Sequence, residues 1–472
     1  MKNFSKTVTK YLLILFPPIF FLSYFPIISL GSNSFMNFEL SLPEIWLVLF
    51  FIFSLPQLKE LYKFYGVKKL LISAILPVYF SLTILWSENR PRAILTAGLF
   101  WLLVFAGLNL IYHLKTDKTK RLRPSLIKSL LVSSVVISVF CWLQCILDVA
   151  GISRDYTLLC RGCVSTTFGF PHPSGFAIEP QFMGNLLLAP VLLCFYLLSR
   201  TQKHRQRQIH LVLMTLFLTT TLFLTLSRGA IYAFLVALFI MLMLIRQKPM
   251  AIRSIAYAII SLALALATFG VFSALGPTSD TFLSGTTKAI HQLTLGKIDL
   301  RPQEVVDNPL INEVIEDTST MSDVASFSGY VEESTNTRLS LNSLAIRTWA
   351  TSPQYVLIGA GLGSAGPAMH QVFPEEIGPK EIVQNEYVSL LLETGLTGIA
   401  LLLGVVIFTT YTLIKSKLLA KNPLFISVVF GFALTLLFFS GLPNALHLYL
   451  FSLLFFNFNL RAKDNFLIAD KV

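Results

Sequence analysis

Charged residues are scarce in this chain. Asp, Glu, Lys and Arg together make up 13% of its 472 residues, whereas they make up about a quarter of a typical soluble domain. Hydrophobic residues account for 54%, and 40 residues are phenylalanine. A composition so poor in charge excludes an ordinary soluble protein of this length. We therefore expect an integral membrane protein.

Cysteines and metal-ligand patterns are also few. The chain has 5 cysteines, and Cys141, Cys145 and Cys194 fall in apolar runs, where a thiol behaves as a small hydrophobic group. For Cys160 and Cys163, a short disulfide or no bond at all is favoured over a zinc site, which needs two more ligands that are not at motif spacing. No pair of carboxylates stands at metal-ligand spacing. We expect no obligatory metal and no other cofactor.

Apolar runs recur along the chain, and about 20 helical residues suffice to cross a bilayer. The pattern predicts an all-α polytopic membrane protein in which residues 1–275 form nine spans, 276–383 form a large external loop and 384–472 form the last three spans. The roughly twelve expected spans lie between charged residues, at 11–30, 42–56, 70–86, 93–113, 129–150, 175–198, 209–226, 229–245, 254–275, 386–413, 423–440 and 443–460.

The distribution of charge tests this interpretation, because Lys and Arg gather on cytoplasmic loops. With both termini cytoplasmic, 26 of the 37 Lys and Arg fall on the cytoplasmic side, and 21 of the 25 Asp and Glu fall on the external side. Topology thus explains the net charge of +12, and no nucleic-acid partner is needed. A cytoplasmic patch for anionic membrane lipid remains an open alternative.

The external loop is long for a protein that merely spans a membrane, which makes it a candidate for function. Its first half contains an irregular, acidic run at 304–323. Its second half has apolar residues at helical spacing between 335 and 353 and reaches Pro353, which predicts an amphipathic helix.

A glycine-rich run at 358–366 contains the letters G-x-G-x-x-G. The dinucleotide-binding fingerprint of that form needs a strand before it and a βαβ unit around it, and this context is absent here. We interpret the glycines as positions where backbone packs closely at the membrane surface or against a ligand.

Arg228 interrupts an apolar run that extends from 211 to 245. A single helix of this length would exceed the thickness of the hydrocarbon core. The chain is therefore expected to reverse at 227–229, on the external side. A charge at such a reversal either has a function or only anchors the turn by snorkelling.

Four short motifs together resemble the O-antigen ligase and O-antigen polymerase family. Members are integral-membrane glycosyltransferases of about a dozen spans with one large periplasmic loop at this position. The resemblance covers about 205–405, with Trp86-Ser87 as a weaker upstream match. The motifs are SRGA at 227–230, ESTNTR at 333–338, GAGLGS at 359–364 and QNEY followed by ETGLTG at 384–398.

This resemblance implies a transferase in the cytoplasmic (inner) membrane that builds lipopolysaccharide, capsule or another exopolysaccharide. The implied donor is an oligosaccharide on a polyprenyl pyrophosphate such as undecaprenyl pyrophosphate, and the acceptor is a sugar hydroxyl on a glycan or a lipid-linked glycan. Arg228 and Arg338 match the two arginines of the family. Because a guanidinium pairs bidentately with phosphate oxygens, we expect both to bind the diphosphate.

Ligases of the family carry a histidine immediately before the motif asparagine, but Gln384 stands there in this chain. Glutamine can orient a hydroxyl but cannot take its proton, which slightly favours a polymerase. Glu386 and His370 are candidate substitutes for the base. Asn385 is a candidate substrate ligand, although Asn385 and Glu386 equally fit a helix cap. We expect Glu393 to be structural.

A proline-rich stretch at 168–185 brings His172, Glu179 and Gln181 to the external interface. We expect His172 and Glu179 to line the acceptor path beside Arg228. The alternative is a proline-kinked re-entrant loop without chemistry.

The competing class is a transporter, or a flippase for the same lipid-linked glycans. Transporters show internal repeats and charges near the bilayer midplane. The chain shows no repeat at half its length, its carboxylates lie almost wholly in loops, and its external cations are interfacial. Glycosyl transfer is therefore the favoured function.

Overall fold

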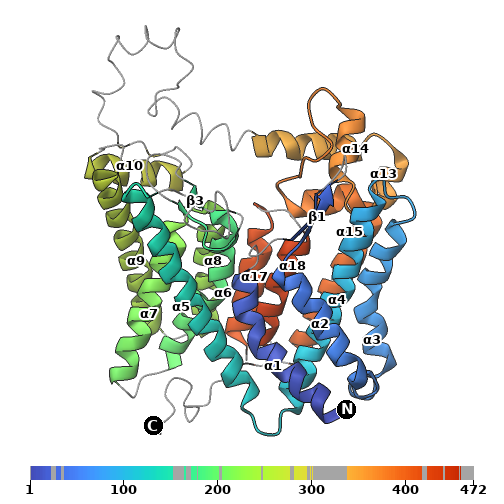
Figure 1. The fold of residues 1–472 in the computed structure, drawn as a ribbon, viewed down its shortest axis with the longest axis horizontal. Coiled ribbons are helices and arrows are strands. Elements are labelled where there is room, and N and C mark those ends of the chain that lie inside the picture. The colour runs from blue at the N-terminus through green and yellow to red at the C-terminus, as the bar shows by residue number, and fades with distance from the viewer. Residues whose placement is uncertain are drawn as a thin grey trace.

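The computed structural model describes residues 2–22, 28–32, 37–152, 164–165, 172–177, 179–200, 205–245, 248–276, 281–294, 298, 300, 337–416, 422–438, 442–456 and 458. In this part of the chain, helices predominate and stand side by side as a bundle (Figure 1). Residues 337–349 are also helical. The other helices are α1 (Lys2–Phe21), α2 (Leu42–Ser54), the short 3-10 helix η1 (Leu55–Gln57), α3 (Leu58–Thr83), α4 (Arg90–Thr116), α5 (Leu122–Val149), α6 (Pro180–Arg200), α7 (Arg205–Leu224), α8 (Arg228–Ile245), α9 (Lys248–Leu275), α10 (Phe282–Leu293), α13 (Pro353–Ile358), α14 (Ala365–Val372), α15 (Glu386–Lys415), α17 (Pro423–Thr435) and α18 (Leu442–Leu454).

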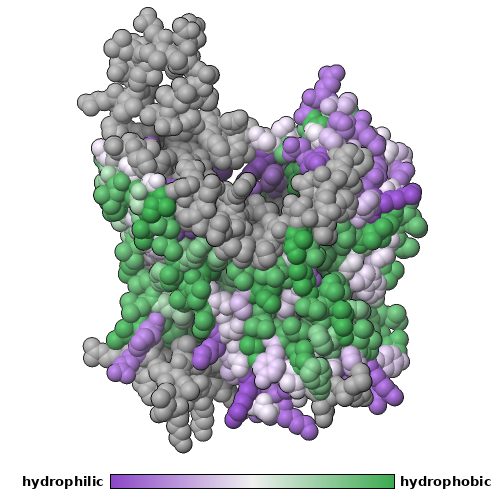
Figure 2. Space-filling view, viewed as in Figure 1, coloured by the Kyte–Doolittle hydropathy of each residue, from purple (hydrophilic) through white to green (hydrophobic). Residues whose placement is uncertain are grey.

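Seven candidate spans among these helices are long and apolar enough to cross a membrane. A hydrophobic band covers the middle of the bundle, with hydrophilic residues above and below it (Figure 2). The chain is therefore a polytopic helical membrane protein, whereas the count of twelve spans, the sidedness and the three-part division at 275 and 383 stay predictions. The candidate spans are Leu42–Thr83, Arg90–Thr116, Leu122–Val149, Pro180–Ser199, Arg228–Ile245, Ala251–Leu275 and Glu386–Lys415.

The two ends of the bundle differ. Helices α10, α13 and α14 lie at the upper end in Figure 1, which we call the loop end, and α1 begins at the opposite end. The helical second half of the predicted loop is confirmed, since residues 337–349, α13 and α14 all belong to it.

Two small hairpins modify the expectation of an all-helical fold. Strand β1 (Ile28–Ser32) pairs antiparallel with β2 (Asn37–Leu40), and β3 (Val164–Ser165) pairs antiparallel with β4 (His172–Pro173). The first apolar run therefore does not continue as helix to residue 30. Helix α1 instead starts at Lys2 and is already 20 residues long at Phe21.

Helix α10 lies within the predicted external loop, where the sequence analysis did not expect it. Thr281 caps its first turn by accepting a hydrogen bond from Ser284 N at 3.2 Å. Two glycines let it approach α9 closely, because a Cβ on Gly270 would lie 2.6 Å from the Phe282 ring and one on Gly285 would lie 2.4 Å from Ser273 Cβ. The close contact with α9 explains why this short helix forms.

Helix α6 lies at the centre of the core. Nearly every residue of this helix is buried, and it packs against α7, α8 and α17. A helix that is apolar all round is stable only when others surround it. Its first residues, from Pro180, are thereby held at a fixed place in the bundle, next to the first turn of α8.

Candidate functional site

The reversal at Arg228 is confirmed. Helix α7 ends at Leu224 and α8 begins at Arg228, with Leu226 at a positive φ of 46° in the turn between them. Thr225 Oγ1 accepts a hydrogen bond from Ser227 N at 3.3 Å, and Ser227 Oγ accepts one from Ala230 N at 3.4 Å. The half-buried Arg228 thus stands at a helix N-terminus, where both its charge and the peptide dipoles favour an anion.

Two glycines fit the start of α8 against its neighbours. A Cβ on Gly229 would lie 2.9 Å from Phe438 Cβ, and one on Gly184 of α6 would lie 2.8 Å from Ala230 Cβ. Phe438 belongs to the turn 436–438 that follows α17, which we call the α17 turn. Arg228 is therefore the chain neighbour of Gly229, which packs directly on the α17 turn.

Arg338 reaches the same turn through one glutamine. It lies in the second position of the helical residues 337–349, and its Nη2 donates to Gln181 Oε1 at 3.3 Å. Gln181 Nε2 in turn donates to the carbonyl oxygen of Phe438. Gln181 was noted in the proline-rich stretch, but its link to Arg338 spans 157 residues of sequence and was not predicted.

The N-terminus of α15 packs on the α17 turn from another side. The backbone N–H of Glu386 donates to Leu436 O at 3.0 Å, and Tyr387 OH donates to Ala433 O at 2.8 Å. Asn385 is the N-cap, since its Oδ1 accepts from the backbone N–H of Tyr387 at 3.0 Å and of Val388 at 3.3 Å. This geometry agrees with the capping alternative for Asn385. The Glu386 side chain is buried, and Gln384 is partly exposed beside it.

Segments distant in sequence therefore meet at one place. We define the arginine site as Arg228, Arg338, Gln181, Glu386 and the α17 turn. It brings together the N-terminus of α8, which starts with Arg228, and Arg338 with its hydrogen-bonded partner Gln181, at the loop end of the bundle. Such an arrangement suits an anionic group with several oxygens.

The glycine loop, residues 359–366, packs tightly on α15. Gly359, Gly361 and Gly363 have φ values of 77°, 94° and 73°, which side chains other than glycine rarely adopt. A Cβ on Gly359 would lie 2.4 Å from Glu393 O. Opposite it, α15 kinks at Gly395, which has a φ of 63°. The interpretation of these glycines as close-packing positions is confirmed.

Glu393 holds this loop. Its backbone oxygen accepts from Gly361 N at 2.9 Å, and its buried Oε1 accepts from Ala365 N at 3.3 Å. Leu392 O accepts from Ala360 N at 2.9 Å. This set of bonds agrees with the structural role expected for Glu393.

The upstream motif at Trp86-Ser87 contacts the glycine loop. Ser87 Oγ lies 2.7 Å from Ser364 Oγ and 3.1 Å from Leu362 O. The next residue, Glu88, accepts a hydrogen bond from Tyr355 OH at 2.6 Å. Burial raises the pKa of Glu88, although the bond from Tyr355 opposes the rise. The sequence analysis did not select Glu88, and its position next to the Trp86-Ser87 motif was the only signal for it.

The other predicted residues have surroundings of different kinds. His370 Nδ1 is hydrogen-bonded to Ile377 O at 2.6 Å within the cluster around α14. Glu179 is exposed just before α6. His172 is buried in β4, and burial lowers its pKa to about 3, which makes it a poor base near neutral pH.

The cysteines and metal ligands add little to the site. Cys141, Cys145 and Cys194 are buried free thiols, and Cys160 and Cys163 lie outside the described residues. Within the described ranges, no three His, Cys, Asp or Glu residues are grouped as metal ligands. Independence from metals stays a prediction.

A comparison with protein families matches residues 211–403 to the family described as O-Antigen ligase. The matched range contains Arg228, Arg338, the glycine loop and the N-terminus of α15, but not Gln181 or the α17 turn. A comparison with curated proteins finds no match.

Proposed function

We propose that this chain, of which residues 211–403 match the O-Antigen ligase family, is a member of that family and transfers a glycan from a polyprenyl-pyrophosphate carrier to a sugar hydroxyl at the loop end of the bundle. The family match, together with the apolar helices, supports an O-antigen ligase-type glycosyltransferase in a membrane. The donor, the acceptor and the roles of individual residues are our proposal.

The observation that carries the proposal is that the segments of both arginines pack on the α17 turn. Arg228 adjoins Gly229, which packs on Phe438, and Arg338 reaches the carbonyl of Phe438 through Gln181. Glycosyl transfer releases a diphosphate, whose negative charge grows as the bond to the sugar breaks. Fixed cations that meet this charge stabilise the transition state more than the ground state.

The proposed step exchanges the bond to the carrier for a bond to the acceptor. The acceptor hydroxyl oxygen forms a bond to the anomeric carbon, while the bond from that carbon to the phosphate oxygen breaks. The electron pair leaves on the polyprenyl pyrophosphate, next to Arg228 and Arg338. The hydroxyl proton passes to a carboxylate, and Gln384 orients the hydroxyl because an amide can accept and donate hydrogen bonds but takes no proton.

Two carboxylates are candidates for the proton acceptor. Glu386 is buried in the first turn of α15, on the α17 turn itself. Glu88 is partly buried beside the glycine loop with a raised pKa, which brings its basicity closer to neutral pH. We favour Glu386 because it belongs to the arginine site.

The test is glycan transfer by the purified full chain in lipid nanodiscs. The reaction contains a polyprenyl-pyrophosphate-linked repeat unit and a chelator, and products are separated on a gel. A ladder of lengthening lipid-linked glycan identifies a polymerase, as Gln384 favours, and a single addition to a different acceptor identifies a ligase. Activity that survives the chelator supports metal independence.

Variants test the roles of the residues. We expect Arg228→Ala and Arg338→Ala each to lose about 100-fold or more in rate, since a buried charged contact to a substrate is worth roughly 3 kcal/mol or more. Arg347→Ala is the matched control, because Arg347 lies on the same helix but stacks on the Phe373 ring at 4.4 Å. The proposal fails if folded wild-type protein transfers nothing from its native donor, or if Arg347→Ala loses as much as the other two. Movement of the lipid-linked donor across the bilayer of sealed vesicles that contain the protein, without transfer, would instead support a flippase.

A further inference from the structure

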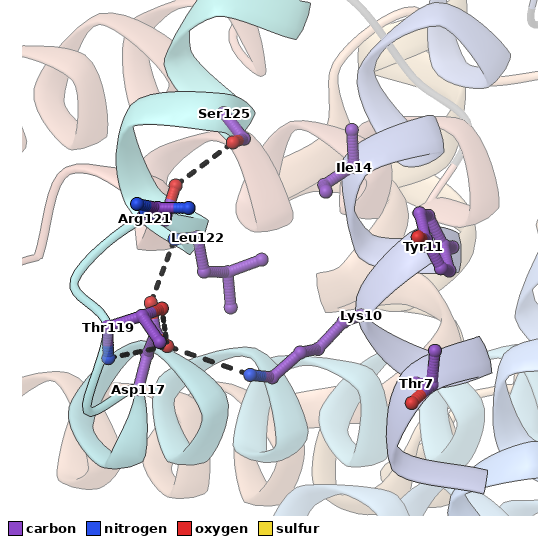
Figure 3. A pocket seen from close by; sticks show the side chains of 9 residues that line it. All are labelled: Thr7, Lys10, Tyr11, Ile14, Asp117, Thr119, Arg121, Leu122 and Ser125. Carbon is purple, nitrogen blue, oxygen red and sulfur yellow. Dashed lines mark hydrogen bonds and ion pairs between the residues drawn. The ribbon is translucent and has the colours of Figure 1, made fainter. Parts of the chain in front are cut away.

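A second polar site lies at the end of the bundle opposite the arginine site. A pocket of about 240 Å³ opens between α1 and the start of α5. Thr7, Lys10 and Tyr11 line it from α1, and Arg121 and Ser125 line it from the start of α5 (Figure 3). Nothing in the proposed transferase reaction uses these residues.

The charges in this pocket leave a positive excess. Lys10 Nζ lies 3.6 Å from Asp117 Oδ1. Asp117 is held by other donors as well, because its Oδ2 accepts from Leu122 N at 2.8 Å and its Oδ1 accepts from Thr119 Oγ1 at 2.8 Å. Burial acts to raise the pKa of Asp117, but these hydrogen bonds and Lys10 lower it overall, so the carboxylate is charged at neutral pH. It balances one cation, and the exposed Arg121 adds a further positive charge.

The outer face of α5 changes from polar to apolar just beyond the pocket. Arg121, Ser125 and Lys128 are followed at helical spacing by Val132, 53% exposed, and Val136, 63% exposed. Residues three and four apart share one face of a helix. The pocket therefore adjoins a surface suited to hydrocarbon chains.

Helix α1 shows the same change beside it. Tyr11, which lines the pocket, is 64% exposed, and Leu15 one turn further is 49% exposed. Helices α1 and α5 pack against each other, so their outer faces form one continuous surface. In Figure 2 hydrophilic residues at the lower end give way to the hydrophobic band above. Tyr is typical of this boundary in membrane proteins.

We propose that this pocket binds the phosphate headgroup of an anionic membrane phospholipid, with Arg121 and Lys10 as the cationic ligands. Apolar side chains of Ile14 and Leu122 also line the pocket, and the lipid chains would continue along α1 and α5. A soluble phosphate would gain nothing from this apolar surface. Since Lys and Arg predominate at the chain segments of this end, the positive-inside rule assigns the lipid to the cytoplasmic leaflet.

The test uses the purified full chain in detergent and does not depend on transferase activity. Phosphatidylglycerol and phosphatidylcholine with the same acyl chains are titrated, and bound lipid is counted by native mass spectrometry. Arg121→Gln removes an exposed cation at little risk to folding, and Lys10→Gln removes the second. Lys69→Gln is the matched control, because Lys69 is an exposed lysine of α3 that does not line the pocket.

We expect phosphatidylglycerol to bind at least fivefold more tightly than phosphatidylcholine. Arg121→Gln should weaken the binding of phosphatidylglycerol about fivefold, which corresponds to roughly 1 kcal/mol per cation near an anionic lipid. Lys69→Gln should leave this affinity unchanged. Equal binding of the two lipids, or wild-type affinity in Arg121→Gln, would overturn the proposal. Full displacement of the lipid by glycerol phosphate would also overturn it, since the site would then recognise a soluble anion.

Discussion

Replacing Gln181 by alanine removes the amide through which Arg338 reaches the α17 turn. The Gln181 amide accepts from Arg338 Nη2 at 3.3 Å and donates to Phe438 O. Without this amide, Arg338 keeps its charge but loses the group that fixes its guanidinium beside the α17 turn. We therefore expect an effect on donor use rather than on folding.

The size of this effect follows from the geometry. A hydrogen bond to a charged group contributes about 1.5–3 kcal/mol, and a distance of 3.3 Å lies just beyond the usual range. We take the lower value of about 1.5 kcal/mol, which corresponds to roughly a tenfold loss in kcat/KM for the lipid-linked donor. Gln181→Glu should lose at least as much, because its carboxylate would compete with the diphosphate for Arg338.

Initial rates at varied donor concentration measure this loss. Gln354→Ala is the matched control, since Gln354 is an exposed glutamine of α13 at the loop end. The melting temperatures of all variants in detergent establish that they fold. If Gln181→Ala keeps kcat/KM within twofold of the wild type, the linkage of Arg338 through Gln181 has no part in catalysis and our reasoning is refuted.

Three further predictions concern Gly395, His172 and Glu88. Gly395→Ala should destabilise the protein by about 2 kcal/mol or more, because the φ of Gly395 is 63° and a Cβ there would lie 2.6 Å from Gly359 N. Gly404→Ala is the control. A Cβ at Gly404 would have nothing within 4 Å, so this change should leave the melting temperature unchanged or raise it. Burial keeps His172 neutral in the folded state, with a pKa of about 3. Below about pH 6.5 the unfolded chain therefore binds one more proton than the folded chain, and the free energy of unfolding should decrease by roughly 1.4 kcal/mol for each pH unit by which the pH is lowered. His172→Gln should flatten this dependence in melting curves from pH 7.5 to 5, and an unchanged slope would contradict it. If Glu386 is the base, Glu88→Gln should keep kcat within threefold of the wild-type value. A loss in kcat as large as that of Glu386→Gln would identify Glu88 as the base instead.

Local physical limits made part of this structure predictable from the sequence. The run from 211 to 245 is too long for one helix, so its reversal at Arg228 followed from bilayer thickness alone. The clustered glycines indicated a close approach of backbone, and the structure shows it at Gly361, where a Cβ would lie 2.4 Å from Ser87 Cα. The contact between the Trp86-Ser87 motif and the glycine loop joins two motifs that were noticed separately.

The remainder depends on contacts between distant segments. The α17 turn carries no motif, and its role appears only because Gln181, Gly229 and Glu386 reach it from three different helices. The hydropathy pattern also placed the end of the first span too late. Hydropathy does not show that the helix already begins at the polar residues around Lys2, so that 20 helical residues are complete at Phe21. Asn385 illustrates a different limit, because a capping residue and a substrate ligand have the same sequence signature.

The most direct test of the central claim is the affinity of the purified chain for undecaprenyl pyrophosphate compared with undecaprenyl monophosphate. If the arginine site holds the leaving diphosphate, the wild type should bind the pyrophosphate at least tenfold more tightly. Arg228→Ala and Arg338→Ala should each abolish most of that difference, and Arg347→Ala should preserve it. Equal affinity for the two lipids in the wild type, or an unchanged preference in both arginine variants, would contradict the account.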